Sequence, residues 1–389
     1  MKKLRIGVIY GGRSGEHEVS VASAAAVMKN LDKDRYETVP IRIEKDGCWT
    51  IQDRPPTSVS AAEVIEQGRL QVARSIRPVR EAYLVTRPGE EQLLTIERGA
   101  SAHSADTDGQ NAYVTALGLD VIFPVLHGPF GEDGTVQGLL ELANVPYVGA
   151  GVLASAVGMD KAIMKVLFAA RRLPIVDHIV VMRREWQADR RGTIDQTVGK
   201  LGLPVFVKPA NLGSSVGISK AKTVSELQDA IDLAAEFDRK IVIEASVPNA
   251  REIECAVLGN DDPEASVPGE VVPSREFYDY DAKYIDEGSK LLIPAPLPDA
   301  QASEVRRLAV DAFRAIDGAG MARVDFLLAR DSNALYLNEI NTIPGFTTIS
   351  MYAKLWAASG VDYPALLDRL VELALARHAE KQQLRTSMT

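Results

Sequence analysis

Short apolar runs that end in glycines or polar residues open the chain. Residues 4–9 form the first run, an Ala- and Val-rich helical stretch follows at 19–29, and a second strand is predicted at 38–43. A strand, a helix and a strand in this order begin an α/β domain. The pattern returns with VIFPVLHG at 121–128 and a predicted helix at 135–143. We therefore predict an open α/β domain in the first part of the chain.

The pattern loosens between residues 52 and 117. A Pro-Pro pair, a predicted hairpin around Pro88-Gly89 and a polar stretch after it interrupt the alternation of strands and helices. We interpret 52–117 as an insertion into the N-terminal domain, which we place at 1–155.

A smaller α+β domain is predicted at 156–247. Its first helix is predicted at 159–170, with an apolar stripe that faces the core and consists of Met159, Ile163, Val166 and Leu167. Apolar runs then predict strands at 178–182, 205–210 and 240–246 and a helix at 224–237.

The remaining residues, 248–389, are predicted to form a third domain. Strands are expected at 252–258, 322–329 and 335–341, and helices at 300–317 and near the C-terminus. The chain is therefore expected to be a multidomain protein of the α/β and α+β classes.

Composition restricts the function classes. The formal net charge of −9 gives no general attraction for nucleic acid or anionic membranes, so neither is an expected partner. Cys48 and Cys255 are the only cysteines, which excludes a disulfide framework and a cysteine-rich zinc site. No apolar run reaches about 18 residues, and the N-terminal run is too short for a signal peptide. We expect a cytoplasmic protein without membrane insertion.

The pattern with the most chemical content is MARVDFLLARDSNALYLNEIN. Alternation places Arg323 and Asp325 on one face of a strand, and Glu339 and Asn341 on one face of the next. A turn centred on Ser332 would pair Asp325 with Glu339, and the arginine with the asparagine. Paired carboxylates repel unless a cation lies between them, and these oxygen ligands suit Mg²⁺ or Mn²⁺. The alternative is a solvated face on which Arg323 neutralises the acids.

A second signal is VFVKPANLGSSVG, in which Lys208 ends a strand and a Gly/Ser loop follows. Small residues let backbone N–H groups approach an anion, and the lysine adds a charge, so the segment suits a phosphate chain. It is not a Walker A loop, because the lysine precedes the glycines. The alternative is a plain surface turn.

A third signal is GGRSGEHEVS, which follows the first strand and runs into a helix. Ligands of open α/β sheets gather at this edge, where Glu16 could hold an ammonium group. Alternatively, Glu16 and Glu18 complement the helix dipole and Ser14 caps the helix. His127 also sits where a strand ends, although an isolated histidine is more often structural.

Weaker signals come from isolated residues. Glu244 follows the apolar run KIVI and could face a nucleotide or cap a strand. Lys283 and Tyr284 lie in the aromatic segment EFYDYDAKY, which could equally be packing. Cys255 lies within a strand and is expected in the core.

Taken together, the motifs resemble those of D-alanine–D-alanine ligases of the ATP-grasp superfamily. In chain order they are GGRSGEHEVS, LHGPFGEDGTVQG, MDK, VKPANLGSSVG, IVIEAS, REIE, FYDYDAKY, RVDF and NEINTIPG. The resemblance spans almost the whole chain and implies an ATP-grasp fold with an N-terminal open α/β (pre-ATP-grasp) domain. The segment 52–117 resembles the longer N-terminal insertion of some members.

The resemblance implies a nucleotide site and a metal site. ATP phosphates would contact Lys161, Lys208, Ser214 and Ser215, and adenosine would contact Glu244, Ala245, Val247 and Glu252. Two Mg²⁺ or Mn²⁺ ions would be bound by Asp325, Glu339 and Asn341.

The resemblance also implies substrate positions. Glu16 would hold the ammonium of the first D-alanine, His127 would lie near its carboxylate, and Lys283 would contact substrate. Arg323 and the N–H of Gly345 would stabilise the oxyanion, and Tyr284 and Ser214 would join Glu16 in a hydrogen-bonded network. Ser350 and Met351 would line the second D-alanine site.

The implied reaction joins two D-alanine molecules for peptidoglycan synthesis. ATP converts the first carboxylate into an acyl phosphate, which the second amino group attacks. Because water would hydrolyse this intermediate, the loop 211–217 and the segment 276–290 are expected to close over the site. The resemblance also implies a homodimer.

Two departures from the family bear on specificity. Ala245 stands where some members carry a lysine near the purine, so adenine recognition would use backbone groups. Tyr284 resembles the members that form dipeptides, which favours D-alanine over D-lactate as the second substrate. The alternatives are a related ligase with another second substrate and a nucleotide-binding regulatory protein, although the latter would be expected to have lost residues that are all present here.

Overall fold

The computed structural model describes residues 2–58, 60–71, 80–88, 93–98, 112–273 and 290–385. The chain forms two compact units. Unit 1 comprises Met1–Ala150, Gly345–Ala353 and Val361–Thr389, and unit 2 comprises Gly151–Pro344 and Lys354–Gly360. The predicted domain limits near residues 155 and 247 stay a prediction. Two segments from the end of the chain belong to unit 1, which the sequence did not indicate.

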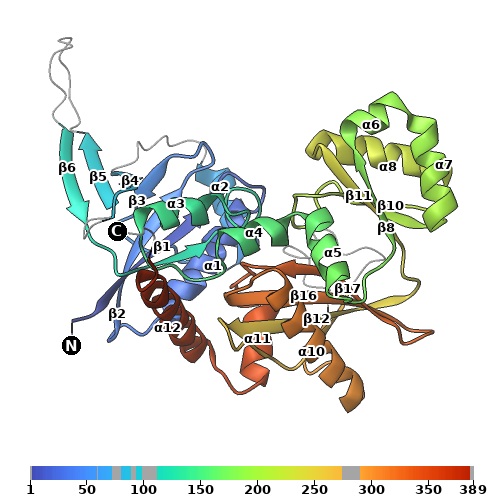
Figure 1. Cartoon of the computed structure of the whole chain (residues 1–389). Coiled ribbons are helices and arrows are strands. Elements are labelled where there is room, and N and C mark those ends of the chain that lie inside the picture. The colour runs from blue at the N-terminus through green and yellow to red at the C-terminus, as the bar shows by residue number, and fades with distance from the viewer. Residues whose placement is uncertain are drawn as a thin grey trace, which may run out of the picture. The chain divides into compact units, whose positions relative to one another are not determined.

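Unit 1 contains a seven-stranded sheet with the order β6-β5-β4-β3-β2-β1-β7 (Figure 1). Its strands are β1 (Leu4–Gly11), β2 (Tyr36–Ile43), β3 (Trp49–Ile51), β4 (Glu81–Leu84), β5 (Leu93–Arg98), β6 (Ala112–Leu117) and β7 (Val121–Val125). β1 is parallel to β2 and β7, as expected for an α/β opening. The strands from β3 to β6 are added in antiparallel fashion. The predicted insertion therefore extends the sheet, and its predicted hairpin is confirmed as β4 and β5.

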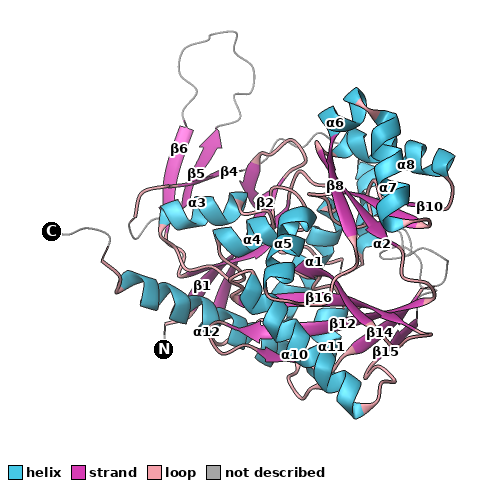
Figure 2. Cartoon of the chain, turned by 45° about the vertical axis from the view of Figure 1, so that its right-hand side comes forward, coloured by secondary structure: helices cyan, strands magenta, loops and turns pink. Residues whose placement is uncertain are grey.

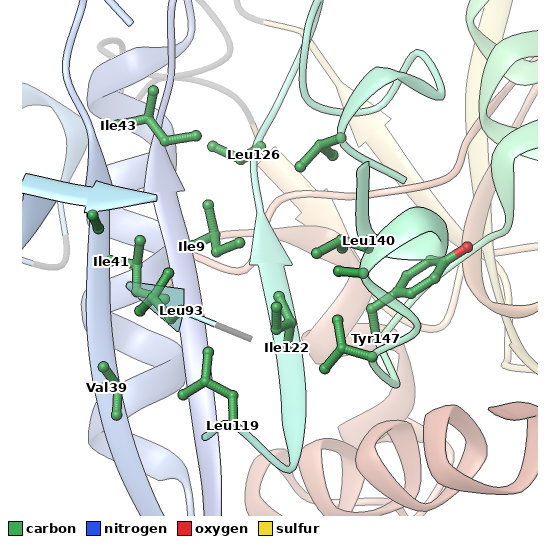
Figure 3. Close-up of a cluster of buried hydrophobic side chains, with 14 residues drawn as sticks. Ile9, Val39, Ile41, Ile43, Leu93, Leu119, Ile122, Leu126, Leu140 and Tyr147 are labelled. Carbon is green, nitrogen blue, oxygen red and sulfur yellow. The ribbon is translucent and has the colours of Figure 1, made fainter. Parts of the chain in front are cut away.

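Helices cover both faces of this sheet. They are α1 (His17–Asn30), α2 (Ala61–Gln71), α3 (Thr135–Ala143) and α12 (Tyr363–Gln382), and α11 (Met351–Ala358) begins in unit 1. Figure 3 shows Ile9, Ile41 and Ile122 packing with Leu140 of α3 on one face. Neighbouring strand residues point to the opposite face, and α1 and α12 both contact β7.

Unit 2 contains two sheets, of which the first is antiparallel with the order β10-β9-β11-β8. Its strands are β8 (His178–Met182), β9 (Val205–Pro209), β10 (Ser219–Ala221) and β11 (Lys240–Ala245). The helices α6 (Arg183–Ala188), α7 (Arg190–Leu201) and α8 (Val224–Phe237) belong to the same region. Trp186, Val207 and Ile231 are fully or almost fully buried in its core, which confirms an α+β arrangement here.

The second sheet of unit 2 has the order β15-β14-β12-β16-β17, and β13 pairs with β12. Its strands are β12 (Ala250–Gly259), β13 (Glu264–Ala265), β14 (Gly269–Val272), β15 (Lys290–Leu292), β16 (Gly320–Ala329) and β17 (Leu335–Asn341). α10 (Asp299–Ala315) contacts β12 and β16, and Figure 2 shows it beside this sheet. α4 (Val152–Met159) contacts β17. Within the described residues, no helix is both long enough and apolar enough to cross a membrane.

The hairpin of β16 and β17 confirms the predicted pairing but corrects the predicted turn. The pairs Arg323 with Asn341 and Asp325 with Glu339 are present. Nearer the turn the register is displaced by one residue, so the turn is centred between Asp331 and Ser332 instead of on Ser332. A β-bulge at Asn338 supplies the extra residue and restores the predicted register.

The predicted apolar stripe of the first helix of 156–247 is wrong. The helix is α5 (Lys161–Ala170), which is separate from α4 and is capped by the side chain of Asp160. Ile163 and Val166 are 44% and 59% exposed, whereas Lys161 and Lys165 are buried. The lysines occupy the inward face because carboxylates of the same unit meet them there.

Candidate active site

Polar side chains gather where β1 and β7 end in unit 1. Glu16 is buried at the start of α1, and a Cβ added at Gly128 would lie 2.6 Å from its Oε2. Ser14 does not cap α1, in contrast to the alternative prediction. Its hydroxyl accepts from the N–H of Glu16 at 3.2 Å and donates to the carbonyl of His127 at 2.7 Å. The loops that carry Glu16 and His127 are therefore held together, as the crevice argument predicted.

The segment 345–350 of unit 1 forms a closely packed loop. The N–H of Thr347 donates to Ser350 Oγ at 3.0 Å, and the two hydroxyl oxygens are 2.7 Å apart. A Cβ at Gly345 would lie 2.8 Å from Ser350 Oγ, so a larger residue would displace that hydroxyl. Met351 follows and is buried. Ser350, predicted for the second substrate, is therefore held by contacts within the loop.

Unit 2 buries two lysines around one carboxylate. Glu244 of β11 forms ion pairs with Lys165 at 2.9 Å and with Lys208 at 2.7 Å, and the three side chains are at most 10% exposed. Burial opposes the charged form of Glu244, but the two lysines outweigh it and lower its pKa from 4.5 to about 2. Burial lowers the pKa of Lys165. Burial also tends to lower the pKa of Lys208. The attraction of Glu244 and of further carboxylates outweighs burial, so the pKa of Lys208 is raised.

The bulge of β17 lies beside these lysines. Lys208 Nζ donates to Asn338 Oδ1 at 3.2 Å, and Lys165 Nζ lies 3.4 Å from the carbonyl oxygen of the same residue. Lys161 Nζ donates to the carbonyl of Leu212 at 2.8 Å and lies 3.5 Å from Glu339 Oε2. Ammonium groups of three lysines, the Gly/Ser loop and the β17 face therefore converge within unit 2, which suits a polyanion.

The loop 211–217 has an unusual backbone. Ser214 and Ser215 have φ angles of 49° and 61°, in the left-handed region that residues other than glycine rarely adopt. Gly217 also has a positive φ, and a Cβ there would lie 2.7 Å from the Phe237 ring. Backbone strain of this kind is concentrated at ligand clamps and active sites. Other non-glycine residues, such as Asn144 and Asn333, also have positive φ, so the phosphate loop and the plain surface turn both stay predictions.

Carboxylates from three adjacent strands lie in one row. Asp325 pairs with Glu254 of β12 on one side and with Glu339 of β17 on the other, so all three share a face. Arg323 donates to both oxygens of Asp325 at 2.7 Å, and its Nε lies 3.1 Å from Glu254 Oε2. Asn341 Nδ2 donates to Asp325 Oδ2 at 3.0 Å. Arg323 does neutralise part of this row, but the row is mostly buried rather than a solvated surface.

This donor set fits a divalent cation. Hard cations prefer carboxylate and amide oxygens, which Asp325, Glu339 and Asn341 present from paired strands. Among the residues that the structure describes, no group of three His, Cys, Asp or Glu side chains is arranged to hold a metal by itself. An ion here would need further oxygens, and phosphate groups are a suitable source.

The residues predicted for adenosine lie around the end of β11 and the start of β12. Ala245, Val247 and Glu252 are all partly exposed. The N–H of Ala245 donates to the carbonyl of Asp177 at 2.9 Å, and the N–H of Ser246 donates to that of Pro204 at 3.2 Å. Backbone recognition of a purine would therefore have to use groups other than these two N–H donors.

Two predicted residues, Lys283 and Tyr284, lie outside the described residues, as does all of the segment 276–290 except its last residue. Cys255 is fully buried, which confirms its place in the core.

Two protein-family models match the chain. A family model for the N-terminus of D-ala D-ala ligase matches residues 5–150, and a model for the C-terminus of D-ala D-ala ligase matches residues 167–372. The chain belongs to the D-alanine–D-alanine ligase family. The resemblance stated from the motifs is therefore confirmed.

Relatives in this family match the chain over nearly its full length. It is 50% identical over 385 residues to the D-alanine–D-alanine ligase of Heliobacterium modesticaldum, covering 98% of both chains. It is 48% identical over 383 residues to that of Solibacter usitatus, covering 98% of this chain and 99% of the relative.

Solved structures of D-alanine–D-alanine ligases and of a related enzyme show the same fold. The ligase of Coxiella burnetii has a TM-score of 0.79 at 35% identity and covers 98% of this chain and 97% of its own. A D-Ala:D-Ser ligase of Enterococcus faecalis also has a TM-score of 0.79, at 30% identity, and covers 96% of this chain and 100% of its own. The expected ATP-grasp fold is confirmed by these neighbours.

Sequence reasoning missed three buried residues in this member of the D-alanine–D-alanine ligase family. Lys165 lies four residues after Lys161, on the same face of α5, and this spacing could have revealed it. Glu254 alternates with Glu252 in the motif REIE, which is the spacing of one strand face. Ser23 of α1 carried no local signal, because serine among alanines is common in buried helices.

Proposed function

We propose that this chain joins two D-alanine molecules to D-alanyl-D-alanine with ATP, through a D-alanyl phosphate, and releases ADP and phosphate for peptidoglycan synthesis. The observation that carries the proposal is the convergence in unit 2 of Lys161, Lys208 and the β17 carboxylate face. Basic groups next to oxygen ligands are the combination that phosphoryl transfer requires.

Unit 2 would bind the nucleotide. Lys161 and Lys208 would neutralise the phosphates, and the strained backbone at Ser214 and Ser215 would place loop N–H groups against them. Lys165 and Glu244 would hold Lys208 in place from behind. We assign adenosine to Glu244, Ala245, Val247 and Glu252, on the resemblance to the family.

Asp325, Glu339 and Asn341 would hold Mg²⁺ or Mn²⁺, and we propose two ions. Such ions supply neutralisation of charge on the phosphate oxygens while the γ-phosphoryl group is transferred. Arg323 donates to Asp325 and forms an ion pair with Glu254 beside the donor set. Its guanidinium would stabilise the oxyanion that forms when the acyl phosphate is attacked.

Unit 1 would bind amino acids. Glu16 would hold the ammonium of the first D-alanine, and His127 would receive its carboxylate. The N–H of Gly345 would donate to the oxyanion, and Ser350 with Met351 would line the second D-alanine site. Lys283 and Tyr284, together with Ser214, complete the proposed set on the resemblance to the family.

The test is phosphate release by the purified chain with ATP, Mg²⁺ and D-alanine, with mass analysis of the product. L-Alanine, D-lactate and D-serine serve as parallel second substrates, the last because a structural neighbour is a D-Ala:D-Ser ligase. We expect the enzyme to form D-alanyl-D-alanine and to accept none of the other three compounds as second substrate. Preferred use of another second substrate would overturn the assignment of that subsite, and absence of phosphate release with every mixture would overturn the ligase function.

We also propose that the chain is a cytoplasmic homodimer. The proposed substrates, ATP and amino acids, are cytoplasmic metabolites, and the resemblance to the family implies a homodimer. Sedimentation at several protein concentrations measures the assembly state. A concentration-independent monomer mass contradicts the proposed dimer.

A further inference from the structure

We infer that Ser23 is a positioning residue that fixes the tautomer of His127 and ties this histidine to the loop 345–350. Ser23 lies on α1 and is fully buried. Its Oγ lies 3.1 Å from His127 Nε2 and 3.2 Å from the backbone N of Phe346. These groups come from three distant parts of the sequence and all belong to unit 1.

The proton arrangement follows from the hydrogen-bonding capacity of each group. The N–H of Phe346 can only donate, so Ser23 Oγ accepts from it. Ser23 Oγ has a second lone pair, but if it also accepted from a protonated Nε2 its own buried proton would have no acceptor among its contacts in the described residues, whereas donation to an unprotonated Nε2 satisfies every group. A neutral imidazole whose Nε2 is an acceptor carries its proton on Nδ1. Ser23 thereby makes Nδ1–H the donor of His127.

The Ser23 hydroxyl contacts the loop 345–350 at Phe346, and other contacts hold Phe346 in place. The Phe346 ring packs against Phe123 of β7 and against Tyr363 of α12, with ring centroids 5.8 Å and 6.3 Å apart. The Phe346 carbonyl accepts from the Tyr363 hydroxyl at 2.6 Å. With its N–H on Ser23 and its carbonyl on Tyr363, Phe346 has little freedom to move.

This arrangement has a consequence for substrate binding, which rests on the proposed function. A carboxylate can only accept hydrogen bonds, so His127 must present a donor to the first D-alanine. Ser23 ensures that Nδ1–H is that donor, while its second bond holds the loop that leads to Ser350. One buried hydroxyl would therefore order the binding groups for both substrates.

A neighbouring serine provides a matched control. Ser20 lies one turn earlier on α1 and is equally buried. It also accepts from a backbone N–H, that of Gly11 at 2.7 Å, and it donates to the carbonyl of Val125. It therefore resembles Ser23 in burial and hydrogen bonding, but its partners are backbone groups only.

The test is ¹⁵N NMR of protein labelled in its histidines, without substrates, where imidazole nitrogen shifts and two-bond couplings identify the protonated nitrogen. The chain has five histidines, and the signal of His127 is assigned by its loss in His127→Gln. We expect wild-type His127 to carry its proton on Nδ1. A proton on Nε2, or a charged ring at neutral pH, in the wild-type protein overturns the inference.

Two variants distinguish the positioning of His127 by Ser23 from a general contribution of a buried serine to α1. Ser23→Ala is expected to give a mixed tautomer at His127 and about a tenfold rise in KM for D-alanine, because the Nε2 acceptor is left without its partner. Ser20→Ala is expected to leave the His127 tautomer unchanged. An unchanged tautomer in Ser23→Ala, or an equal change in Ser20→Ala, overturns the inference. Because the tautomer is read without substrate, failure of the ligase assay would overturn the proposed function alone.

Discussion

At the residue scale, the most informative feature is charge placed where apolar side chains are expected. Lys165 is fully buried, and Glu244 is its nearest partner. Buried ion pairs add little net stability, because desolvation offsets the attraction, but removal of one partner leaves an uncompensated charge. Such residues are therefore sensitive points, and they make quantitative tests possible.

Lys165→Met should destabilise unit 2. Glu244 would keep only Lys208, while the bulge carbonyl of Asn338 would lose a neighbour. We expect a loss of about 3 kcal/mol in the free energy of unfolding, measured by denaturant titration. Val166→Ala, at an exposed position on the same helix, should change it by less than about 0.5 kcal/mol. Equal effects of the two variants would contradict the orientation of α5.

The free energy of unfolding should decrease at low pH, over a pH range set by the pKa of Glu244. Because the folded pKa of Glu244 is lowered to about 2, its contribution is complete above 4.5 and is lost as the pH falls from 4.5 towards 2. The difference amounts to about 3 kcal/mol. Glu244→Gln should therefore reduce the slope of stability against pH in this window, as followed by urea unfolding at each pH. An unchanged slope would show that other carboxylates dominate.

Arg323→Ala should reduce kcat without weakening ATP binding. Loss of the guanidinium should cost about 3 kcal/mol or more of transition-state stabilisation. Steady-state kinetics and nucleotide titration measure the two effects. Arg251→Ala is the control, because Arg251 forms a comparable pair with Glu270 at 2.7 Å on the opposite face of the same sheet. Wild-type turnover of Arg323→Ala would remove the role proposed for this residue.

At the scale of elements, the bulge in β17 decides which side chains meet the site. Leu335 and Leu337 are buried, and strict alternation would send Glu339 to the same side. The extra residue, Asn338, changes the phase, so that Ile340 is buried while Glu339 and Asn341 take the other face. A strand can in this way contribute first to the core and then to a polar site.

At the start of α12, Asp362 caps the helix and Tyr363 contacts the loop 345–350. Separate variants can measure the effect of each. Tyr363→Phe removes the hydrogen bond to the Phe346 carbonyl and should raise KM for D-alanine, with about 1 kcal/mol of stability lost. Asp362→Ala removes the side-chain cap of the same helix and should cost a similar amount of stability without the rise in KM. Calorimetry and steady-state kinetics on both variants decide this. A rise in KM in Asp362→Ala of equal size would indicate a general effect of the helix end.

At the scale of the whole molecule, sequence patterns predicted the local chemistry better than the assembly of elements. The pairing of Asp325 with Glu339 followed from alternation, and Lys208 from its place between a strand and a Gly/Ser loop. The predicted stripe of α5 was wrong because it used Ile163 and Val166, whereas the buried side carries Met164 and Phe168 together with the two lysines of the helix, which alternation of apolar and polar residues does not reveal. The place of α12 in unit 1 could not be predicted, because an amphipathic pattern shows which face is buried and not which partner buries it.

Removal of residues 361–389 should prevent unit 1 from folding. Leu366, Leu367 and Leu370 of α12 are fully buried, and α12 contacts α1 and β7. A chain that ends at residue 360 should expose this apolar surface and be digested rapidly within residues 1–150 by a protease. Resistance equal to that of the full chain would show that α12 is dispensable.

α12 belongs to unit 1 but follows unit 2 in the sequence. Unit 1 therefore cannot finish folding when its first 150 residues have been synthesised. Residues 1–150 leave the ribosome before unit 2, yet the helix that covers α1 and β7 is synthesised after unit 2. The growing chain must carry an unfinished N-terminal unit while all of unit 2 is translated. Until α12 is synthesised, the apolar surface that Leu366, Leu367 and Leu370 pack against stays open to solvent, which exposes the nascent chain to aggregation.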